Sequence, residues 1–169
     1  RLGGNAVPLQ LPIGSEEKFV GVVDLIEMRA FYWDLDELGL ECREAEIPEA
    51  VLPDAQLWRE NLLEAVVESD ESLMEKYLEG ISLDLAEIKA GLRSLVINGK
   101  LVPVYCGSAF KNKGVQQLLD AVVEYLPSPL DIGNTHGKNP NNGKEETRKP
   151  ADSEPFSALA FKIMADPFV

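Results

Sequence analysis

Residues 101–129 constrain the fold of this chain more than any other segment. Residues 101–105 are mostly apolar, with β-branched and aromatic side chains, and predict a buried strand that ends before Gly107. After a loop of small residues, Pro127 and Pro129 mark the end of a predicted helix. The helix is predicted from apolar residues at helical spacing, namely Val115, Leu118, Leu119, Val122, Val123 and Leu126. A strand, a loop and a helix in this order predict an α/β fold.

The 107–114 loop is the first candidate binding site. In open α/β sheets, ligands bind beyond the carboxyl end of a strand, where a loop leads into the next helix. Ser108 and Ala109 are small enough to let backbone N–H groups approach the flat edge of a ligand. A generic strand-to-helix turn explains the same pattern, so the loop by itself leaves both interpretations open.

The segment before residue 53 predicts a small sheet. Pro8 and Pro12 restrict its first strand to an edge or irregular position. Asp24 is predicted as a break or bulge within the most strand-like stretch, whose second half alternates between apolar and charged residues. Residues 33–39 predict a polar turn. The extended stretches cover residues 6–11, 19–33 and 40–47.

Three helices are predicted between residues 54 and 99. Asp54 is the expected cap of the first, the second ends near Gly80, and the third starts at Ser82 or Asp84. The first has an apolar face formed by Leu57, Trp58, Leu62, Ala65 and Val66. The third has one formed by Leu85, Ile88, Leu92, Leu95 and Val96.

Three glutamates, Glu60, Glu64 and Glu68, follow one another at four-residue spacing and predict an exposed acidic face on the first helix. The chain has a net charge of −13, and its first 100 residues contain 21 acidic and 9 basic residues. Such a surface is repelled by nucleic-acid phosphates and favours a basic protein partner, although a simply solvated helix face has the same pattern. Acid–base catalysis is not expected there, because an exposed helix has no pocket to shift a carboxyl pKa.

The last forty residues change character. Residues 130–154 predict a linker, because residues 131–143 are dense in Gly, Pro and Asn and are typical of loop or disorder; His136 is expected to be solvated. Residues 155–169 predict a strand that begins a further domain, with Phe156, Leu159, Phe161 and Ile163 close to alternation.

Several classes of protein are not expected from the composition. No apolar run approaches the ~20 residues of a membrane span, and the first residues lack the apolar region of a signal peptide. Cys42, Cys106 and the single His136 are too few for a zinc site, and the cysteine usage favours a reduced, cytoplasmic compartment. The chain does not begin with Met, so we expect a piece of a longer protein.

The run YCGSAFKNKGVQQLLDAVVEYLPSPLD, residues 105–131, resembles the last guanine-contacting motif of translational GTPases, most closely that of bacterial elongation factor G. VPLQLPIG and FVGVVDLIEMRA resemble the insertion subdomain that this family carries within its G domain, and PFSALAFKIMADPFV looks like the start of the following β-barrel domain. The resemblance implies an α+β insertion subdomain over residues 1–100 and the last strand–loop–helix unit of a P-loop GTPase core over residues 101–129. It also implies a linker and the first strand of a barrel.

The resemblance assigns roles to particular residues. Ser108, Ala109 and Phe110 would border the guanine, with the N–H of Ala109 donating to the base's carbonyl oxygen. The longer protein would bind GTP or GDP with Mg²⁺, and would use GTP hydrolysis on the ribosome to move tRNA and mRNA. In this family the insertion subdomain faces the ribosomal stalk, whose protein has a basic carboxy-terminal domain. Glu60, Glu64 and Glu68 would be its docking surface.

The chain also departs from the family by what it lacks. It contains no G-x-x-x-x-G-K-[ST] phosphate loop, and Asn112-Lys113 is followed by Gly, so it does not start an Asn-Lys-x-Asp motif. By itself the chain is therefore not expected to bind GTP usefully or to hydrolyse it. Two alternatives stay open: a protein-interaction module that acts through the acidic helix, or a paralogous GTPase of the recycling, ribosome-protection, peptide-release or mitochondrial type.

Overall fold

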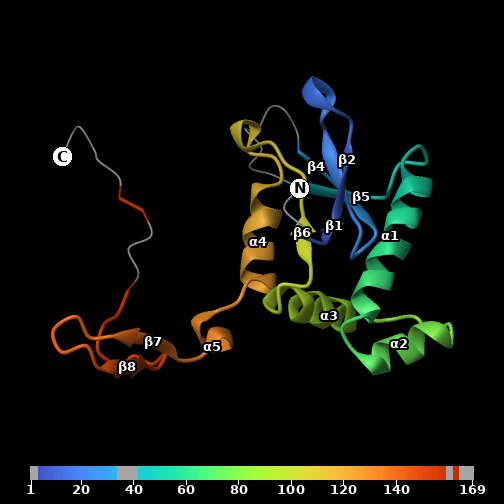
Figure 1. Ribbon diagram of the computed structural model, residues 1–169. Helices are drawn as coiled ribbons and strands as arrows, with labels where there is room; N and C mark the ends of the chain where they lie inside the picture. Colours follow the sequence, from blue (N-terminus) through green and yellow to red (C-terminus); the bar gives the residue numbers. More distant parts are fainter. Residues whose placement is uncertain (1–3, 34–41, 159–161, 164–169) are drawn as a thin grey trace. The chain divides into compact units, whose positions relative to one another are not determined.

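The structure, a computed structural model, describes residues 4–33, 42–158 and 162–163 and has a mixed α/β fold, as predicted (Figure 1). The chain divides into two compact units, Arg1–Leu126 and Pro127–Val169, which are described separately. None of the helices in the described ranges combines the length and the apolar character that a bilayer-spanning segment needs.

A four-stranded antiparallel sheet forms the first half of unit 1. Its strands, in spatial order, are β2 (Gln10–Ile13), β3 (Gly21–Asp24), β4 (Arg29–Trp33) and β5 (Cys42–Ala45). Pro12 lies in the edge strand β2, as its missing N–H requires.

The strand-like stretch of residues 19–33 is a hairpin, and the predicted break at Asp24 is confirmed. The Asp24 carboxylate accepts hydrogen bonds from the backbone N–H groups of Ile26 and Glu27, both at 2.8 Å. This Asx-type turn ends β3, and Met28 follows with a φ of 55°. The alternation predicted for residues 26–30 is therefore wrong for its first half, because those residues form the turn.

A second, two-stranded sheet pairs β1 (Ala6–Pro8) with β6 (Val102–Val104) in parallel. Leu9 joins the two sheets: its N–H donates to the carbonyl of Val104 at 2.9 Å, and its own carbonyl accepts from Leu25 at 3.0 Å. Because Leu9 is fully buried, these bonds hold the end of β6 against the β3–β4 turn.

The helices of unit 1 follow the sequence signals closely, with one exception. Asp84 and Glu87 form a reciprocal capping box at the start of the third helix, which decides for Asp84 over Ser82. Asp54 is not a cap, because the first helix already begins after Val51 and places Asp54 in its first turn. The helices are α1 (Leu52–Val67), α2 (Glu71–Leu78), α3 (Leu85–Ile97) and α4 (Val115–Tyr125), with short 3₁₀ turns η1 (Glu16–Lys18) and η3 (Ala109–Lys111).

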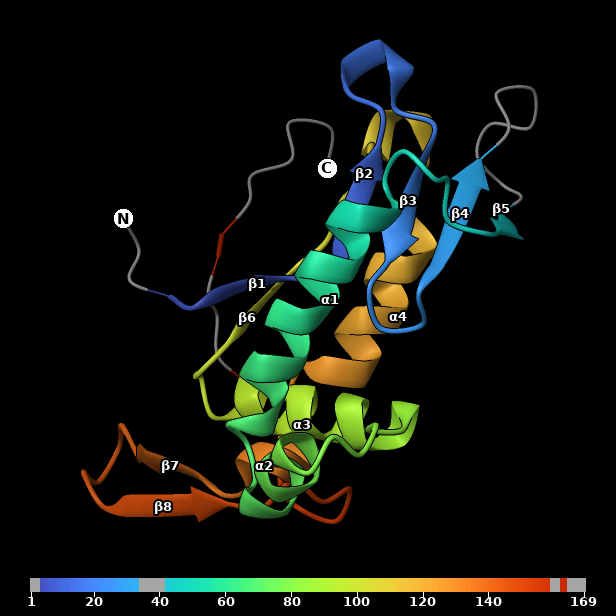
Figure 2. The ribbon, with the colours of Figure 1, turned by 90° about the vertical axis from the view of Figure 1, so that its right-hand side faces the viewer.

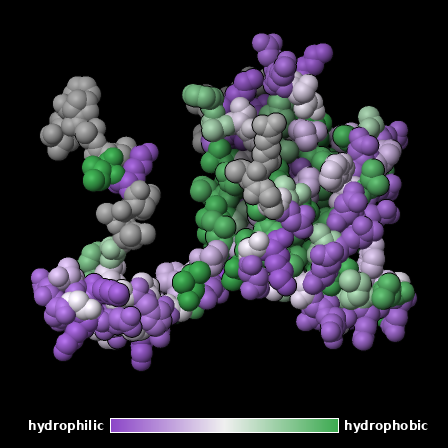
Figure 3. Space-filling model, viewed as in Figure 1, coloured by the Kyte–Doolittle hydropathy of each residue, from purple (hydrophilic) through white to green (hydrophobic). Residues whose placement is uncertain are grey.

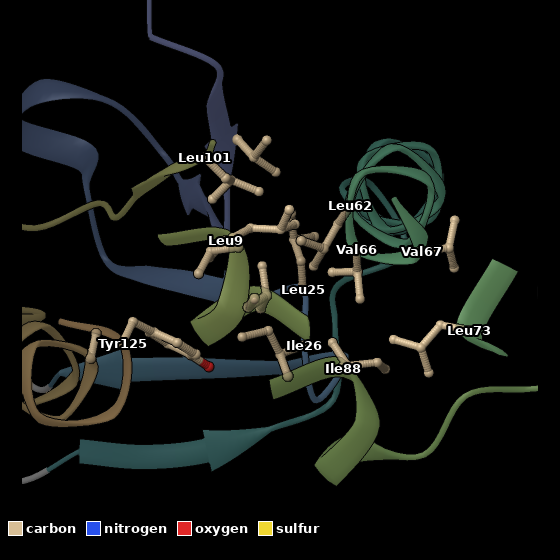
Figure 4. Packing of buried hydrophobic residues seen from close by; sticks show 14 of the residues in the cluster. Leu9, Leu25, Ile26, Leu62, Val66, Val67, Leu73, Ile88, Leu101 and Tyr125 are labelled. Atoms are coloured by element: carbon tan, nitrogen blue, oxygen red, sulfur yellow. The ribbon is translucent and has the colours of Figure 1, made fainter. Parts of the chain in front are cut away.

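The core of unit 1 lies between the two sheets and the helices. Figures 1 and 2 show α1 and α4 on opposite sides of β1 and β6, with α3 crossing below them. Leu62 and Val66 of α1 meet Ile88 of α3 in a continuous buried cluster (Figure 4). Gly91 permits this approach, since a Cβ there would stand 2.8 Å from Val66 Cγ1. The core also takes in Leu101 and Tyr125, so it crosses the predicted boundary at residue 100.

Two predicted apolar faces are exposed in part: α1 buries Leu62 and Val66 as predicted, and most of the α4 face is exposed. On α1, Leu57 is 56% and Trp58 40% exposed, because the helix turns Ala55, Leu62 and Val66 inward. On α4, the residues that enter the core are Ala121 and Tyr125. The exposed residues of α4 and β6, which we call the open apolar face, are Val102, Val104, Leu118, Leu119, Val122, Val123 and Leu126. Figure 3 shows hydrophobic side chains gathered over these elements. The prediction of a buried strand at residues 101–105 is thus wrong for Val102 and Val104.

Unit 2 contains regular structure where the sequence predicted a loop. A single helical turn, α5 (Pro129–Ile132), precedes an antiparallel hairpin of β7 (Thr135–Lys138) and β8 (Glu145–Arg148). His136 is exposed as predicted, and its Nδ1 lies 3.1 Å from Thr147 Oγ1. Residues 155–158 and 162–163 belong to no helix or strand, and the rest of the strand predicted over residues 155–169 lies outside the described residues.

Candidate functional site

The 107–114 loop closes on itself through its own backbone. The N–H of Ser108 donates to the carbonyl of Lys113 at 2.9 Å, and the carbonyl of Ser108 accepts from the N–H of Lys113 at 3.1 Å. The same Ser108 carbonyl accepts from Lys111, which closes the η3 turn. Because the chain between Ser108 and Lys113 is bound at both ends, the loop has a single defined shape at the end of β6.

Two glycines allow this closure. A Cβ at Gly107 would stand 2.9 Å from the carbonyl oxygen of Lys113, and one at Gly114 would stand 2.7 Å from that of Cys106. Gly114 also has a φ of 77°, in the left-handed region that favours glycine. The glycines that bound the predicted loop are therefore required by its geometry.

Lys113 fastens the loop to the antiparallel sheet. Its side chain is only 3% exposed, and its Nζ donates to the carbonyl of Phe19 at 3.0 Å. Residue 19 directly precedes the stretch that enters β3, so the bond joins the loop to the sheet across 94 residues of sequence. Sequence reasoning missed this role, since a lysine in a polar loop is ordinarily solvated.

One side of the loop presents free donors and small side chains. Ser108 has its N–H engaged, whereas the N–H groups of Ala109 and Phe110 donate to no other described residue. Ala109 is exposed and Ser108 half-buried, and both line a cavity of about 280 Å³. Pro103, Cys106, Val115 and Leu118 line the same cavity, so most of its wall is apolar. An apolar wall with a free N–H at its edge suits a planar ring that carries a carbonyl oxygen.

The structure brings together two of the three predicted guanine-binding residues. Ser108 and Ala109 share the cavity, while the Phe110 side chain is fully exposed and does not line it. The backbone N–H of Phe110 donates to no other described residue. Any part of Phe110 in binding would therefore involve its main chain.

The predicted acidic face is a separate site, on α1. Glu60 and Glu64 are exposed along the helix, and Glu68 is exposed just after its last residue. Within the described ranges, none of the three forms an ion pair. Leu57 is exposed one turn before Glu60 and two turns before Glu64, so the face combines carboxylates with an apolar side chain. The sequence pattern located the acids, but it assigned Leu57 to the core.

No known family model matches the chain. Among solved structures, it is similar to the crystal structure of the protein ttk003000868 from Thermus thermophilus, with 35% sequence identity and a TM-score of 0.66. The similarity covers 75% of this chain and 19% of that chain, so this chain corresponds to about a fifth of the longer protein. At this identity and TM-score the two share their fold over the matched part.

Proposed function

We propose that this chain is part of a translational GTPase of the elongation factor G type, and that the 107–114 loop forms one wall of its guanine pocket. The observation that carries the proposal is the free N–H of Ala109 at the edge of the 280 Å³ apolar cavity. The sequence of this loop, GSAFKNKG, is also the part of the chain that most resembles the guanine-contacting motif of that family.

In this proposal the chain's own residues bind and orient the base. The Ala109 N–H donates to the carbonyl oxygen of guanine, and the small Ser108 and Ala109 side chains let the ring edge come close. Lys113 holds the loop in place through Phe19, so the donor is positioned before the ligand arrives. The phosphate loop, the Mg²⁺ contacts and the groups that act on the γ-phosphate would come from parts of a longer protein.

The open apolar face supports a larger parent domain. Strands of parallel sheets are usually covered on both sides, yet Val102 and Val104 of β6 are exposed together with the outer residues of α4. An uncovered face of this composition is typical of an internal surface of a larger domain. In the proposed parent, the other strands of the GTPase core would cover it.

Calorimetric titration with GDP and GTP tests the proposal, using this chain and a longer protein that contains it. Ala109→Pro is the informative variant, because it removes the N–H donor while proline suits the first position of a helical turn. In the longer protein we expect Ala109→Pro to weaken GDP binding at least about tenfold, a loss of ~1.4 kcal/mol. Ala109→Gly keeps the donor and serves as the matched control.

Two results would contradict the assignment. Unchanged GDP affinity in Ala109→Pro would show that this N–H does not contact the base. Micromolar GDP binding by the present chain alone would mean that a complete nucleotide site is formed by residues to which we assign no binding role. Binding by the longer protein only, weakened by Ala109→Pro and not by Ala109→Gly, is the expected outcome.

A second role, protein docking through α1, is favoured by the exposed acidic face. Its unpaired carboxylates and the exposed Leu57 fit a basic partner with an apolar contact, and in the proposed parent this partner is the ribosomal stalk protein. If this chain acts only as an interaction module, docking is its whole function. The same surface would serve a paralogous ribosomal GTPase.

Charge reversal tests whether the partner binds the acidic face of α1 specifically or is attracted by the overall negative charge of the chain. We expect Glu64→Lys with Glu68→Lys to weaken binding to the stalk protein's basic domain by about tenfold or more, and the loss to shrink at high salt. Glu71→Lys with Glu75→Lys changes the charge equally on exposed positions of α2 and is the control. Equal weakening by both pairs would rule out a specific surface on α1.

A further inference from the structure

A second cavity in unit 1 is lined mainly by polar groups. It has a volume of about 240 Å³ and lies between the β3–β4 turn, α3, the end of β6 and α4. Four carboxylates line it, from Asp24, Glu27, Asp120 and Glu124, together with one ammonium from Lys89. We call it the acidic cavity.

The acidic cavity has an excess of hydrogen-bond acceptors. Lys89 is already paired, with its Nζ 2.9 Å from a Glu124 carboxylate oxygen. Asp24 uses one carboxylate oxygen to accept from the turn, and neither Glu27 nor Asp120 forms an ion pair with another described residue. The side-chain oxygen of Gln117, which also lines the cavity, is buried without a hydrogen-bond partner among the described residues. An occupant that satisfies these groups must therefore donate hydrogen bonds.

Tyr125 provides a second, independent observation at this cavity. Its side chain is 1% exposed and lines the cavity, and its hydroxyl makes no hydrogen bond within the described residues. Figure 4 shows the ring reaching from α4 toward Ile26, another residue of the cavity wall. The Glu124 side chain lies near the Tyr125 hydroxyl and contributes to its raised pKa, but the two groups do not meet hydrogen-bond geometry. An unpartnered buried hydroxyl is costly, so its position in a polar cavity calls for an occupant.

The charges around the cavity favour a cation. Burial raises the pKa of the Asp24 carboxyl, against the opposing effect of its turn hydrogen bonds and of the Lys89 charge. Burial is also the main cause of the raised pKa of Tyr125, and Tyr105, the Glu124 side chain and the charge of Asp24 add to it, in that order. A positive group placed among these side chains would relieve the repulsion between the carboxylates and stabilise their charged forms.

We propose that the acidic cavity binds a guanidinium group, carried either by an arginine side chain of a partner protein or by a small free cation. A guanidinium presents five N–H donors in a plane, which suits acceptors that come from several elements. In the described residues, no three His, Cys, Asp or Glu side chains converge closely enough to hold a metal ion, which argues for an organic cation. The cavity is a site distinct from the 107–114 loop and from the acidic face of α1.

The test is a two-dimensional ¹H–¹⁵N NMR titration of this chain, with three probes. Agmatine represents the free cation, and a tetrapeptide with one central arginine represents a protein side chain. The same peptide with citrulline, which is uncharged and nearly isosteric, is the ligand control. We expect saturable shifts that centre on Glu27, Asp120 and Tyr125 for the cations and none for citrulline. Tighter binding of the peptide than of agmatine would identify a partner's side chain as the natural occupant, and the reverse order a free cation.

Two variants locate the binding. Glu27→Gln with Asp120→Asn removes two charges at exposed positions of the cavity, and we expect affinity to fall at least about tenfold. Glu71→Gln with Glu75→Gln removes the same charge from exposed positions of α2, outside both proposed sites, and should leave affinity unchanged. Tyr125→Phe deletes a hydroxyl that has no partner among the described residues, so it should fold and bind the cation about fivefold more weakly.

Three outcomes would overturn the proposal. The first is the absence of saturable shifts up to about 10 mM of either cation. The second is equal weakening by the cavity pair and the α2 pair, which would indicate diffuse attraction to an acidic protein. The third is an affinity for the cations that neither Glu27→Gln with Asp120→Asn nor Tyr125→Phe changes. This result would show that the cations do not bind in the acidic cavity.

Discussion

Helices α3 and α4 have similar apolar patterns but very different environments. Ile88 and Leu92 of α3 are fully buried, whereas Leu119 and Val123 of α4 are 60% and 83% exposed. The difference comes from what covers each helix: α3 packs against α1 and α4 within a buried cluster that includes residues of α2 and the sheets, while the outer side of α4 is left open by the described residues. Periodicity therefore identifies an apolar face, but it does not show whether this chain supplies the residues that cover it.

The two helices also begin differently. Asp84 and Glu87 cap α3 reciprocally, so the start of α3 is specified by four consecutive residues. Helix α4 begins after Gly114, which has a positive φ and offers no side-chain cap. Its start depends on the 107–114 loop, which in turn depends on Phe19 through Lys113. The structure of α4 is thus coupled to distant residues, and that of α3 to local ones.

The largest expected difference between the helices is in core truncation. Leu92→Ala should lower the free energy of unfolding by about 3 kcal/mol, because a fully buried leucine leaves a cavity. Leu119→Ala should lower it by at most ~0.5 kcal/mol in this chain, since the side chain is mostly exposed. Urea unfolding followed by circular dichroism measures both. Similar losses would show that the open apolar face is covered in solution, for example by self-association.

Glycine replacement at the two helix ends should have the next largest effect. Gly114→Ala combines a φ of 77° with a contact of 2.7 Å to the Cys106 carbonyl, and we expect a loss of about 2–3 kcal/mol. Gly99→Ala, after α3, has a φ of 67° but no atom within 4 Å of the new Cβ, so about 1 kcal/mol is expected. The unfolding free energies of the two variants isolate the cost of the close approach. Equal costs would mean that the 107–114 loop can relax.

Loss of the α3 cap is expected to cost less. Asp84→Ala removes the side chain that accepts from the N–H of Glu87 and should lower stability by about 1 kcal/mol. Asp84→Asn preserves the acceptor and should restore most of that loss. Chemical denaturation measures the unfolding free energies of both variants. An unchanged value for Asp84→Ala would show that the start of α3 is held by packing alone.

The smallest predicted effect concerns pH and the aspartates Asp24 and Asp70. Burial raises the pKa of Asp24 above its ordinary 3.8, so its favourable contribution is complete below that pH and is lost as pH rises through the folded-state pKa. Asp24→Asn should therefore become more stable relative to the parent chain between about pH 4 and about pH 7.

Asp70 has the opposite sign. Hydrogen bonds from the Ser72 side chain and backbone lower its pKa, so its contribution is present above its ordinary pKa and lost as pH falls. Asp70→Asn should therefore be less stable than the parent chain near neutral pH, and this difference in unfolding free energy should disappear in acid. Unfolding curves measured from below pH 3.8 up to about pH 7 check both signs, and a pH-independent difference for Asp24→Asn would contradict the burial argument.

Features that depend on neighbouring residues were predicted from the sequence. The break at Asp24, the edge position of Pro12 and the glycine-bounded loop before α4 all follow from a few consecutive side chains. The start of α3 at Asp84 was one of two predicted positions, the other being Ser82. Each reflects a backbone restriction or a hydrogen bond within one turn. Of the candidate site, Ser108 and Ala109 line one cavity, whereas Phe110 does not line it and its side chain is fully exposed.

Other features were decided only by tertiary structure, because they depend on residues far apart in the chain. The β7–β8 hairpin joins two polar segments, THGK and EETR, whose pairing leaves no apolar alternation to detect. The burial of Lys113 requires the carbonyl of Phe19, and the acidic cavity requires four elements to meet around Tyr125. The sequence by itself therefore determined where most helices and turns begin and end. Which of their faces are buried, and which polar groups gather in a cavity, was set by long-range packing that no local pattern records.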